Sequence, residues 1–147
     1  MGSTFPSLHY HIVFSTKERR PFIKSIWRAH LHEYLGGTVR GLGGVPEIVG
    51  GVEDHVHLLV GLRATNCLAD FMQELKKASS VWSAEKHEPD FRWQDGYAAF
   101  TVSSTHSEAV RQYIATQEEH HRKVDFISEL KHLLEKNGVK YEEKYLP

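Results

Sequence analysis

The sequence predicts an α+β fold: a ferredoxin-like antiparallel sheet with helices on one face, followed by two further helices. Stretches of alternating polarity and stretches with apolar residues at helical spacing follow one another as strand, helix, strand, strand, helix, strand. This order is typical of the split βαβ arrangement, in which the first and third strands lie side by side at the sheet centre. The length of 147 residues, 40% of them hydrophobic, suits a single domain over residues 1–147 and is too short for two.

The first part of the chain contains one predicted strand and one predicted helix. Residues 8–15 alternate between apolar and polar side chains, which predicts a half-buried strand. A charged turn over residues 17–21 follows this strand. From residue 22 to residue 35 the apolar side chains recur at helical spacing, and Gly36 with Gly37 is expected to end the helix.

The remaining elements follow at short intervals. Strands are predicted over residues 45–52, 55–62 and 98–103. A helix is predicted over residues 68–86. Thr105, with Glu108 three residues later, forms a capping-box pattern that is expected to open another helix. A last amphipathic helix is predicted over residues 125–137.

Histidines mark the open face of the predicted sheet. Successive side chains of a strand point to opposite faces, so His55 shares a face with His57, and His9 shares a face with His11. The opposite faces of these two strands carry the side chains expected to lie under the helices, namely Tyr10, Ile12, Phe14, Val56, Leu58 and Val60. The open face needs a cover, and the candidate is the later helix whose polar side carries Tyr113, Gln117, His120 and His121.

The spacing His-x-His carries little weight by itself. With 11 histidines among 147 residues, about one such pair is expected by chance, and the chain has three, at residues 9/11, 30/32 and 55/57. A partly buried imidazole with a hydrogen-bond partner is the more common explanation of any single pair. His55 and His57 become candidate metal ligands because the topology brings a second pair and a polar helix to the same face.

The composition excludes several classes of function. The 18 basic and 19 acidic residues give a net charge of −1, so the chain has no overall field that would draw it to nucleic acid. The one cysteine, Cys67, excludes an internal disulfide and a cysteine-based zinc cluster, and no apolar run approaches the roughly 20 residues that span a bilayer. A cytoplasmic protein is therefore expected. Any DNA contact must therefore use local positive charge. The candidates are Lys17, Arg19, Arg20, Lys76, Lys77 and Arg92. The alternative is that these are ordinary solvated side chains.

Several short motifs together resemble one known family. They span nearly the whole chain and are His55-Val56-His57, Tyr113-Ile114-x-x-Gln117, Tyr10-His11-Ile12-Val13-Phe14, Phe91-x-Trp93-Gln94-x-Gly96-Tyr97 and Gln117-x-x-His120-His121. In this combination the chain is similar to the small single-tyrosine transposases of bacterial insertion sequences. These belong to the HUH nucleases, and the insertion-sequence-200-like group among them includes the REP-associated tyrosine transposases.

The resemblance implies a mechanism and its residues. His55, His57 and Gln117 would bind a divalent metal, Mg²⁺ or Mn²⁺, and Tyr113 would attack single-stranded DNA next to a hairpin, forming a 5′-phosphotyrosine. A homodimer would be expected, in which each tyrosine helix completes the site of the partner subunit. Histidines outside the ligand set would orient the ligands or contact DNA, and the candidates are His9, His11, His120 and His121.

The chemistry of these residues suits such a reaction. Two neutral imidazoles and one amide oxygen leave coordination positions open for phosphate oxygens, and the amide oxygen favours the harder divalent ions. Two alternatives stay open. A host-adopted relative would bind or nick repeated hairpin DNA without transposing. An RNA-binding module on the same fold would stack bases on aromatic side chains of the central strands, where this chain has histidines, a valine and a leucine.

Overall fold

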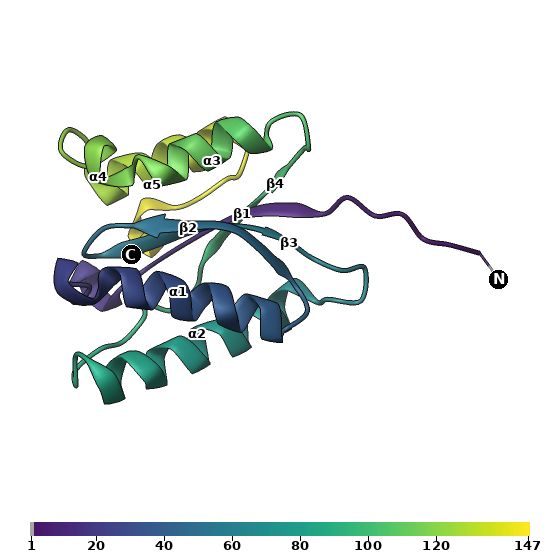
Figure 1. The fold of residues 1–147 in the computed structure, drawn as a ribbon. Coiled ribbons are helices and arrows are strands. Elements are labelled where there is room, and N and C mark those ends of the chain that lie inside the picture. The colour runs from purple at the N-terminus through teal and green to yellow at the C-terminus, as the bar shows by residue number, and fades with distance from the viewer. Residues whose placement is uncertain (1) are drawn as a thin grey trace.

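The computed structural model describes residues 2–147 and has a four-stranded sheet at its centre (Figure 1). The strands are β1 (His9–Ser15), β2 (Val45–Gly51), β3 (His55–Gly61) and β4 (Ala98–Val102). Their order in the sheet is β2-β3-β1-β4, and all neighbours are antiparallel. The first and third strands therefore lie side by side at the centre, as the split βαβ prediction requires.

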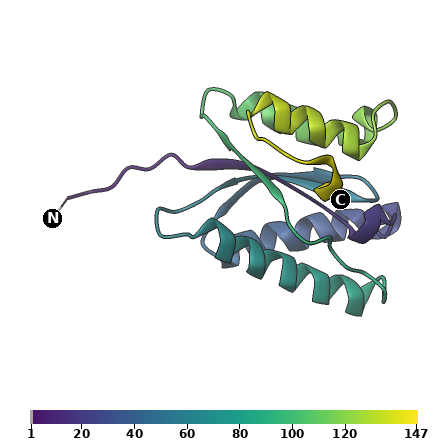
Figure 2. The ribbon, with the colours of Figure 1, turned by 180° about the vertical axis from the view of Figure 1, so that it is seen from behind.

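Helices cover both faces of this sheet, so the chain forms three layers (Figures 1 and 2). The layer on one face consists of α1 (Ser25–Gly41) and α2 (Leu68–Lys86). The layer on the other face consists of α3 (Ser107–Ala115), α4 (Gln117–His120) and α5 (Phe126–Lys136). Two short 3₁₀ turns lie at Lys17–Arg19 and Glu143–Tyr145. The predicted α+β class is confirmed, and within residues 2–147 no helix combines the length and apolarity needed to cross a membrane.

The face under α1 and α2 holds the larger hydrophobic core. Ile12 and Phe14 of β1 and Val56, Leu58 and Val60 of β3 are all buried there, and Tyr10 packs against them partly buried. These are the side chains predicted to lie under the helices. The two helices contribute buried side chains that include Trp27, Leu31, Leu35, Val39, Phe71, Met72 and Leu75. Burial of this apolar surface is the main force that holds α1 and α2 on the sheet.

The opposite face holds a smaller core next to polar groups. Val13 of β1 and Phe100 of β4 pack against Phe126, Leu130 and Leu133 of α5. This cluster fixes α5 over the sheet, and the N-terminus of α5 is capped by Asp125, whose Oδ1 accepts a 2.8 Å hydrogen bond from the backbone N–H of Ser128. The prediction of the last helix is confirmed with the ends shifted by one residue.

Two helix predictions are wrong in detail. The first helix does not end at Gly36 and Gly37 but continues to Gly41, because Leu35 and Val39 continue its buried side. Gly36 is buried against the Pro46 ring of β2, where a Cβ would lie 3.9 Å from that ring, an ordinary van der Waals distance. Ile26, which fits the apolar pattern of this helix, is 88% exposed.

The helix that carries Tyr113 also differs from its prediction. Thr105 and Glu108 form no capping box: the residue before the helix is His106, which has no side-chain cap, and the Thr105 hydroxyl pairs with that of Ser103 at 2.9 Å. The helix is also interrupted at Thr116 (φ −105°, ψ 25°), so Tyr113 lies on α3 and Gln117 begins α4.

A close contact sets the position of α3 on the sheet. At Gly50 of β2 the sheet backbone comes so near that a Cβ would lie 2.5 Å from the carbonyl oxygen of Ile114 and 2.9 Å from its Cγ2. Only glycine leaves room for this approach. Ile114 is buried in this contact, and its neighbour Tyr113 is thereby held over the central strands.

Candidate metal and tyrosine site

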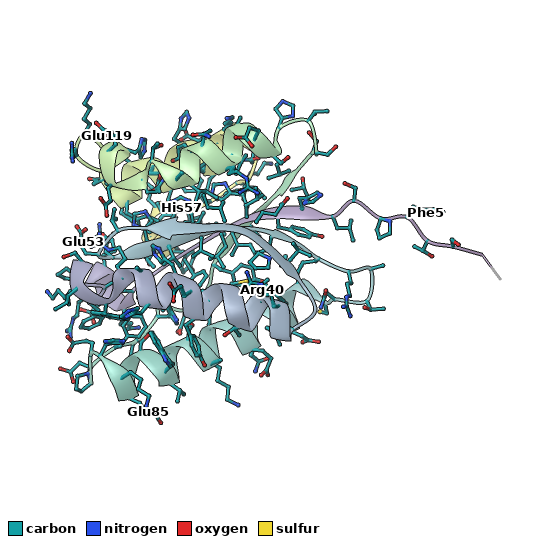
Figure 3. All side chains as sticks on the ribbon, in the orientation of Figure 1. Phe5, Arg40, Glu53, His57, Glu85 and Glu119 are labelled. Carbon is teal, nitrogen blue, oxygen red and sulfur yellow. The ribbon has the colours of Figure 1, made fainter. Side chains whose placement is uncertain are left out.

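The two histidines of β3 lie completely buried between the sheet and the helix layer of α3 to α5. His55 and His57 are both 0% exposed, and Figure 3 shows His57 beneath these helices. Their strand spacing puts both imidazoles on the face predicted for them. Burying an imidazole ring costs free energy unless its nitrogens have polar partners. The partners of these two rings therefore indicate which groups the site can bind.

The imidazoles converge on one carboxylate, that of Glu129 on α5. Its Oε1 lies 3.2 Å from Nε2 of His55 and 3.0 Å from Nε2 of His57. Nε2 of His121 lies 3.0 Å from the same oxygen. The ligand atoms of these four residues all lie within 4.8 Å of one another, a separation that one metal ion could bridge. Glu129 is itself buried, at 2% exposure.

The far nitrogen of each ring has its own partner. Nδ1 of His55 lies 2.7 Å from the carboxylate of Asp54, and Nδ1 of His121 lies 2.6 Å from the carbonyl oxygen of Val124. Both partners accept hydrogen bonds, so Nδ1 carries the proton in these two rings. Nδ1 of His57 lies 2.8 Å from Nε2 of His11, which can also accept. The Nε2 atoms of all three rings converge on one point, and once free of protons they form the donor arrangement of a metal site.

The protonation of the cluster follows from burial and from the carboxylates. Burial lowers the pKa of His57 to about 4, although Glu129 raises it, and burial together with His57 lowers the pKa of His11 to about 3. Burial acts in the same direction on His55, but hydrogen bonds to Asp54 and Glu129 outweigh it and raise its pKa to about 9. Burial disfavours the ionised form of Glu129, but its imidazole partners outweigh burial and hold its pKa far below the usual range.

Tyr113 and Gln117 join this cluster from the other helices. The Tyr113 hydroxyl donates a short hydrogen bond to Oε2 of Glu129. The Gln117 amide nitrogen donates to the same oxygen at 3.1 Å, and its Oε1 lies 3.3 Å from Nε2 of His55. Burial and the hydrogen bond to Glu129 raise the pKa of Tyr113 well above its usual value. The phenol is therefore protonated at neutral pH in this arrangement.

The other histidines predicted for the site differ in how near they lie to the cluster. His11 contacts the cluster through His57, and Nε2 of His120 lies 3.5 Å from Oε2 of Glu129 without hydrogen-bond geometry. His121 was predicted to orient the ligands or to contact DNA, but its Nε2 is itself among the converging ligand atoms. His9 is not brought to the cluster: its Nδ1 pairs with Glu47 of β2 at 3.0 Å.

Glu129 is the residue that sequence reasoning missed. It lies on the buried side of α5, in step with Phe126, Leu130 and Leu133, and a carboxylate on an apolar helix face is the signal that could have found it. Buried carboxylates are rare unless they are paired. Which residues pair with it depends on the tertiary fold, because His57 precedes it by 72 residues.

The candidate DNA contacts are brought together only in part. Lys17, Lys77 and Arg92 line a cavity of about 280 Å³ together with Lys76. The Lys76 ammonium donates to the carbonyl oxygens of Gln94 and Gly96, at 2.6 and 2.7 Å. Lys76 therefore also holds the loop over residues 94–96 in place. Arg19 at the end of the 3₁₀ turn and Arg20 directly after it are exposed and are not part of the cavity lining.

Comparisons with known proteins indicate the family and the fold of this chain. The family described as "Transposase IS200 like" matches residues 4–117. The chain is similar to a solved structure of a candidate transposase from Deinococcus radiodurans R1, with 25% identity and a TM-score of 0.62, over 80% of this chain and 96% of that chain. It is also similar in fold to a REP-associated tyrosine transposase bound to a REP hairpin, with 14% identity and a TM-score of 0.63, over 84% of this chain and 76% of that one. Among curated proteins none matches.

The family match covers part of the site. The matched residues 4–117 include all four strands, the His55-Val56-His57 motif, α3 with Tyr113, and Gln117. His121 and Glu129 follow the matched region and reach the site from α4 and α5. Because the match extends over most of the sequence, the chain belongs to the family of IS200-like transposases.

Proposed function

We propose that this transposase cleaves and rejoins single-stranded DNA beside a hairpin, through a covalent link between the DNA and Tyr113. The observation that carries the proposal is that the Tyr113 phenol and the predicted metal ligands His55, His57 and Gln117 all meet at one buried point, at Glu129. A nucleophile beside a divalent metal site is the pair of groups that phosphoryl transfer needs.

The metal would be held by the two β3 histidines and Gln117, with His121 and Glu129 as additional ligands. The donor set fits, because three Nε2 atoms, an amide oxygen and a carboxylate oxygen lie close together around one place. When bound, a divalent cation supplies charge that polarises the phosphate to be attacked. Mg²⁺ prefers oxygen ligands, whereas Mn²⁺ accepts imidazoles more readily, so the nitrogen-rich set supports Mn²⁺ over Mg²⁺.

In the proposed reaction one bond to phosphorus forms while another breaks, and Tyr113 and Glu129 take part in the bond formation and the proton transfer. The Tyr113 oxygen forms a bond to phosphorus while the bond from phosphorus to the 3′-oxygen breaks. The phenol proton passes to Oε2 of Glu129, to which the hydroxyl is already hydrogen-bonded, and the departing 3′-oxygen takes a proton from solvent water to become a hydroxyl. In the reverse step a 3′-hydroxyl attacks the phosphotyrosine. No ATP is needed, because the phosphotyrosine conserves the broken phosphodiester bond.

Recognition of DNA would use local positive charge. The cavity formed by Lys17, Lys76, Lys77 and Arg92 offers cations to phosphate oxygens, and the exposed Arg19 and Arg20 extend this surface. The likeness to a structure bound to a REP hairpin supports a hairpin as the ligand. Affinity should therefore fall as salt rises, despite the net charge of −1.

We also propose a homodimer, because exchanging two DNA ends requires two phosphotyrosines at once. The resemblance implies that each tyrosine serves the partner's site, but here α3 packs on its own β2, and Tyr113 reaches the cluster of its own chain. The proposal is therefore that each tyrosine acts within its own subunit. Mixing Tyr113→Phe subunits with His57→Ala subunits tests this: no recovery of cleavage is expected, and recovery would show that the sites are shared.

Trapping the covalent link tests the proposed function directly. Labelled single strands from the flanks of the gene are incubated with the protein and Mn²⁺ and then run on a denaturing protein gel. The label should stay with the wild type and be absent with Tyr113→Phe, while Tyr97→Phe, which changes an exposed tyrosine outside the cluster, serves as the matched control. Cleavage without any covalent species would instead make the protein a metal-dependent hydrolase.

A second candidate is a host-adopted nuclease that acts on repeated hairpins without mobilising its own gene. A neighbour of similar fold is bound to a REP hairpin, the kind of ligand on which such a nuclease would act. The same chemistry serves both functions, so the flanking DNA separates them: a mobile copy lies between matching terminal hairpins, and a host-adopted copy does not.

A further inference from the structure

A second cavity lies directly beside Tyr113. It has a volume of about 570 Å³ and is enclosed by the β4 strand, α3 and α5, with His11 of β1 at its base. Figure 2 shows β4 passing below α3 and α5 on this side of the molecule. We call it the tyrosine-side cavity. Tyr113 belongs to its lining and also donates to Glu129, so the cavity adjoins the point at which the phenol would react.

The lining of the tyrosine-side cavity contains no Asp or Glu, although the chain has 19 acidic residues. Its outer part is formed by the exposed side chains of Lys136, His132 and His106. A lysine and imidazoles without a nearby carboxylate in the lining make this part attractive to an anion. The hydroxyls of Thr101 and Ser103 add hydrogen-bonding groups beside it.

The inner part of the cavity is apolar and aromatic. Phe100 and Leu133 are buried there, at 5% and 7% exposure, and the ring of His11 lies 6.1 Å from that of Phe100. An apolar base with a cationic rim fits a ligand that has a flat apolar part and an anionic part. The volume is in the range of pockets that enclose small molecules, roughly 300–1,000 Å³.

We propose that the tyrosine-side cavity binds one nucleotide of the single strand, the one next to the phosphate that Tyr113 attacks. Its base would lie against Phe100 and Leu133, and its own phosphate would lie at Lys136. This inference rests on the proposed function and extends it. Because the cavity takes one base and offers polar edge groups such as Asn137 and Thr101, it gives the enzyme a sequence preference at the position beside the cut.

The smallest probe of the cavity is a free deoxynucleoside monophosphate. Each of the four is titrated into the ¹⁵N-labelled full chain, and the backbone amide shifts are followed by NMR. The shifts should be saturable and should concentrate at Phe100–Ser103, on α3 and at residues 132–137. One of the four bases should bind at least severalfold more tightly than the weakest.

Two substitutions and two matched controls define the site. Ala109→Trp fills the cavity from an exposed position of α3 and should abolish the shifts, whereas Glu108→Trp, at the next exposed position outside the lining, should preserve them. Lys136→Ala should weaken binding roughly tenfold, the effect of one lost charge-assisted hydrogen bond. Lys86→Ala, which removes a lysine from the end of α2 in the other helix layer, should have no effect.

The inference is overturned if the shifts lie elsewhere or persist in Ala109→Trp. It is also overturned if inorganic phosphate alone reproduces the whole pattern with equal affinity, because the site would then bind only an anion. The covalent assay separates this failure from failure of the proposed function. If wild type forms the phosphotyrosine and Ala109→Trp forms it at the same rate on every substrate, only the nucleotide site is wrong, whereas no covalent product from wild type refutes the function itself.

Discussion

The same two central strands contribute side chains to both faces of the sheet, and one face is apolar whereas the other is polar. On one face Ile12, Phe14, Val56 and Leu58 pack under α1 and α2, and on the other His11, His55 and His57 lie under α3 to α5. Neighbouring residues of β3 thus contribute alternately to the hydrophobic core and to the candidate metal site. Both sets are fully buried, so burial alone does not distinguish a structural side chain from a functional one. The distinguishing observation is whether the buried polar atoms converge on a common point.

The largest expected effect tests whether the two faces can be separated. Leu58→Ala removes a fully buried side chain from the apolar face and should lower the free energy of unfolding by about 2–5 kcal/mol. Its affinity for Mn²⁺ under native conditions should change little. His57→Gln, one residue away, should reduce Mn²⁺ affinity more than tenfold with a smaller loss of stability.

Urea unfolding followed by circular dichroism gives the stability of both variants, and calorimetric titration gives their metal affinity. The comparison between the faces breaks down if Leu58→Ala weakens Mn²⁺ binding as strongly as His57→Gln does.

The next effect concerns the protons of the polar face. The metal-free pKa of His55 is raised to about 9, so its ring is protonated at pH 7, and a metal ion must displace that proton. Mn²⁺ affinity should therefore rise about tenfold per pH unit between pH 7 and pH 9 and level off above. His57 and His11, with pKa values of about 4 and 3, are already neutral in this range and should release no proton.

Calorimetry in buffers of different ionisation enthalpy counts the protons released on binding. Asp54→Asn removes the carboxylate partner of His55 and should flatten the pH dependence. Affinity that is independent of pH from 7 to 9 would show that the His55 ring is neutral before the metal binds.

A third substitution acts on the contact that holds the tyrosine over the polar face. Gly50→Ala places a methyl group against the Ile114 carbonyl and should push α3 outwards. Because a displacement of about 1 Å can cost roughly a hundredfold in rate, covalent-complex formation should slow by one to two orders of magnitude. Mn²⁺ binding by the β3 histidines should persist. Normal cleavage by Gly50→Ala would mean that α3 does not need this position in order to react.

The smallest effect belongs to the other helix layer. Gly37 lies inside α1 with nothing within 4 Å of where its Cβ would be. Gly37→Ala should therefore raise the free energy of unfolding by about 0.5–1 kcal/mol, because alanine is the better helix former. Cleavage and metal binding should remain as in wild type. A loss of stability on urea unfolding would show that α1 needs the flexibility of glycine here.

The separation into faces was predictable from the sequence, because alternation at period two is local information. It placed Tyr10, Ile12 and Phe14 on one side and His11 on the other without knowledge of any contact. The end of α1 was not predictable in this way. A glycine such as Gly36 often signals a helix end, but here the burial of Leu35 and Val39 against the sheet carries the helix on to Gly41.

The candidate site was predictable only as far as its motifs. His55, His57, Tyr113 and Gln117 form a recognisable pattern, and the structure brings them together. Glu129 has no motif, since its position depends on how α5 packs on Val13 and Phe100. The same holds for the break at Thr116, which separates α3 from α4 although the spacing of polar residues continues through it.

The late position of Glu129 has a consequence for the protein while it is being made. Translation proceeds at about 5–20 residues per second, so a carboxylate 72 residues after His57 follows that histidine by roughly 4–14 seconds. Throughout that interval the nascent chain has its β3 histidines but not the carboxylate that joins them to Tyr113, which is itself made 16 residues before Glu129. Synthesis itself therefore delays the assembly of the proposed DNA-cleaving centre until α5 has emerged and folded onto the sheet.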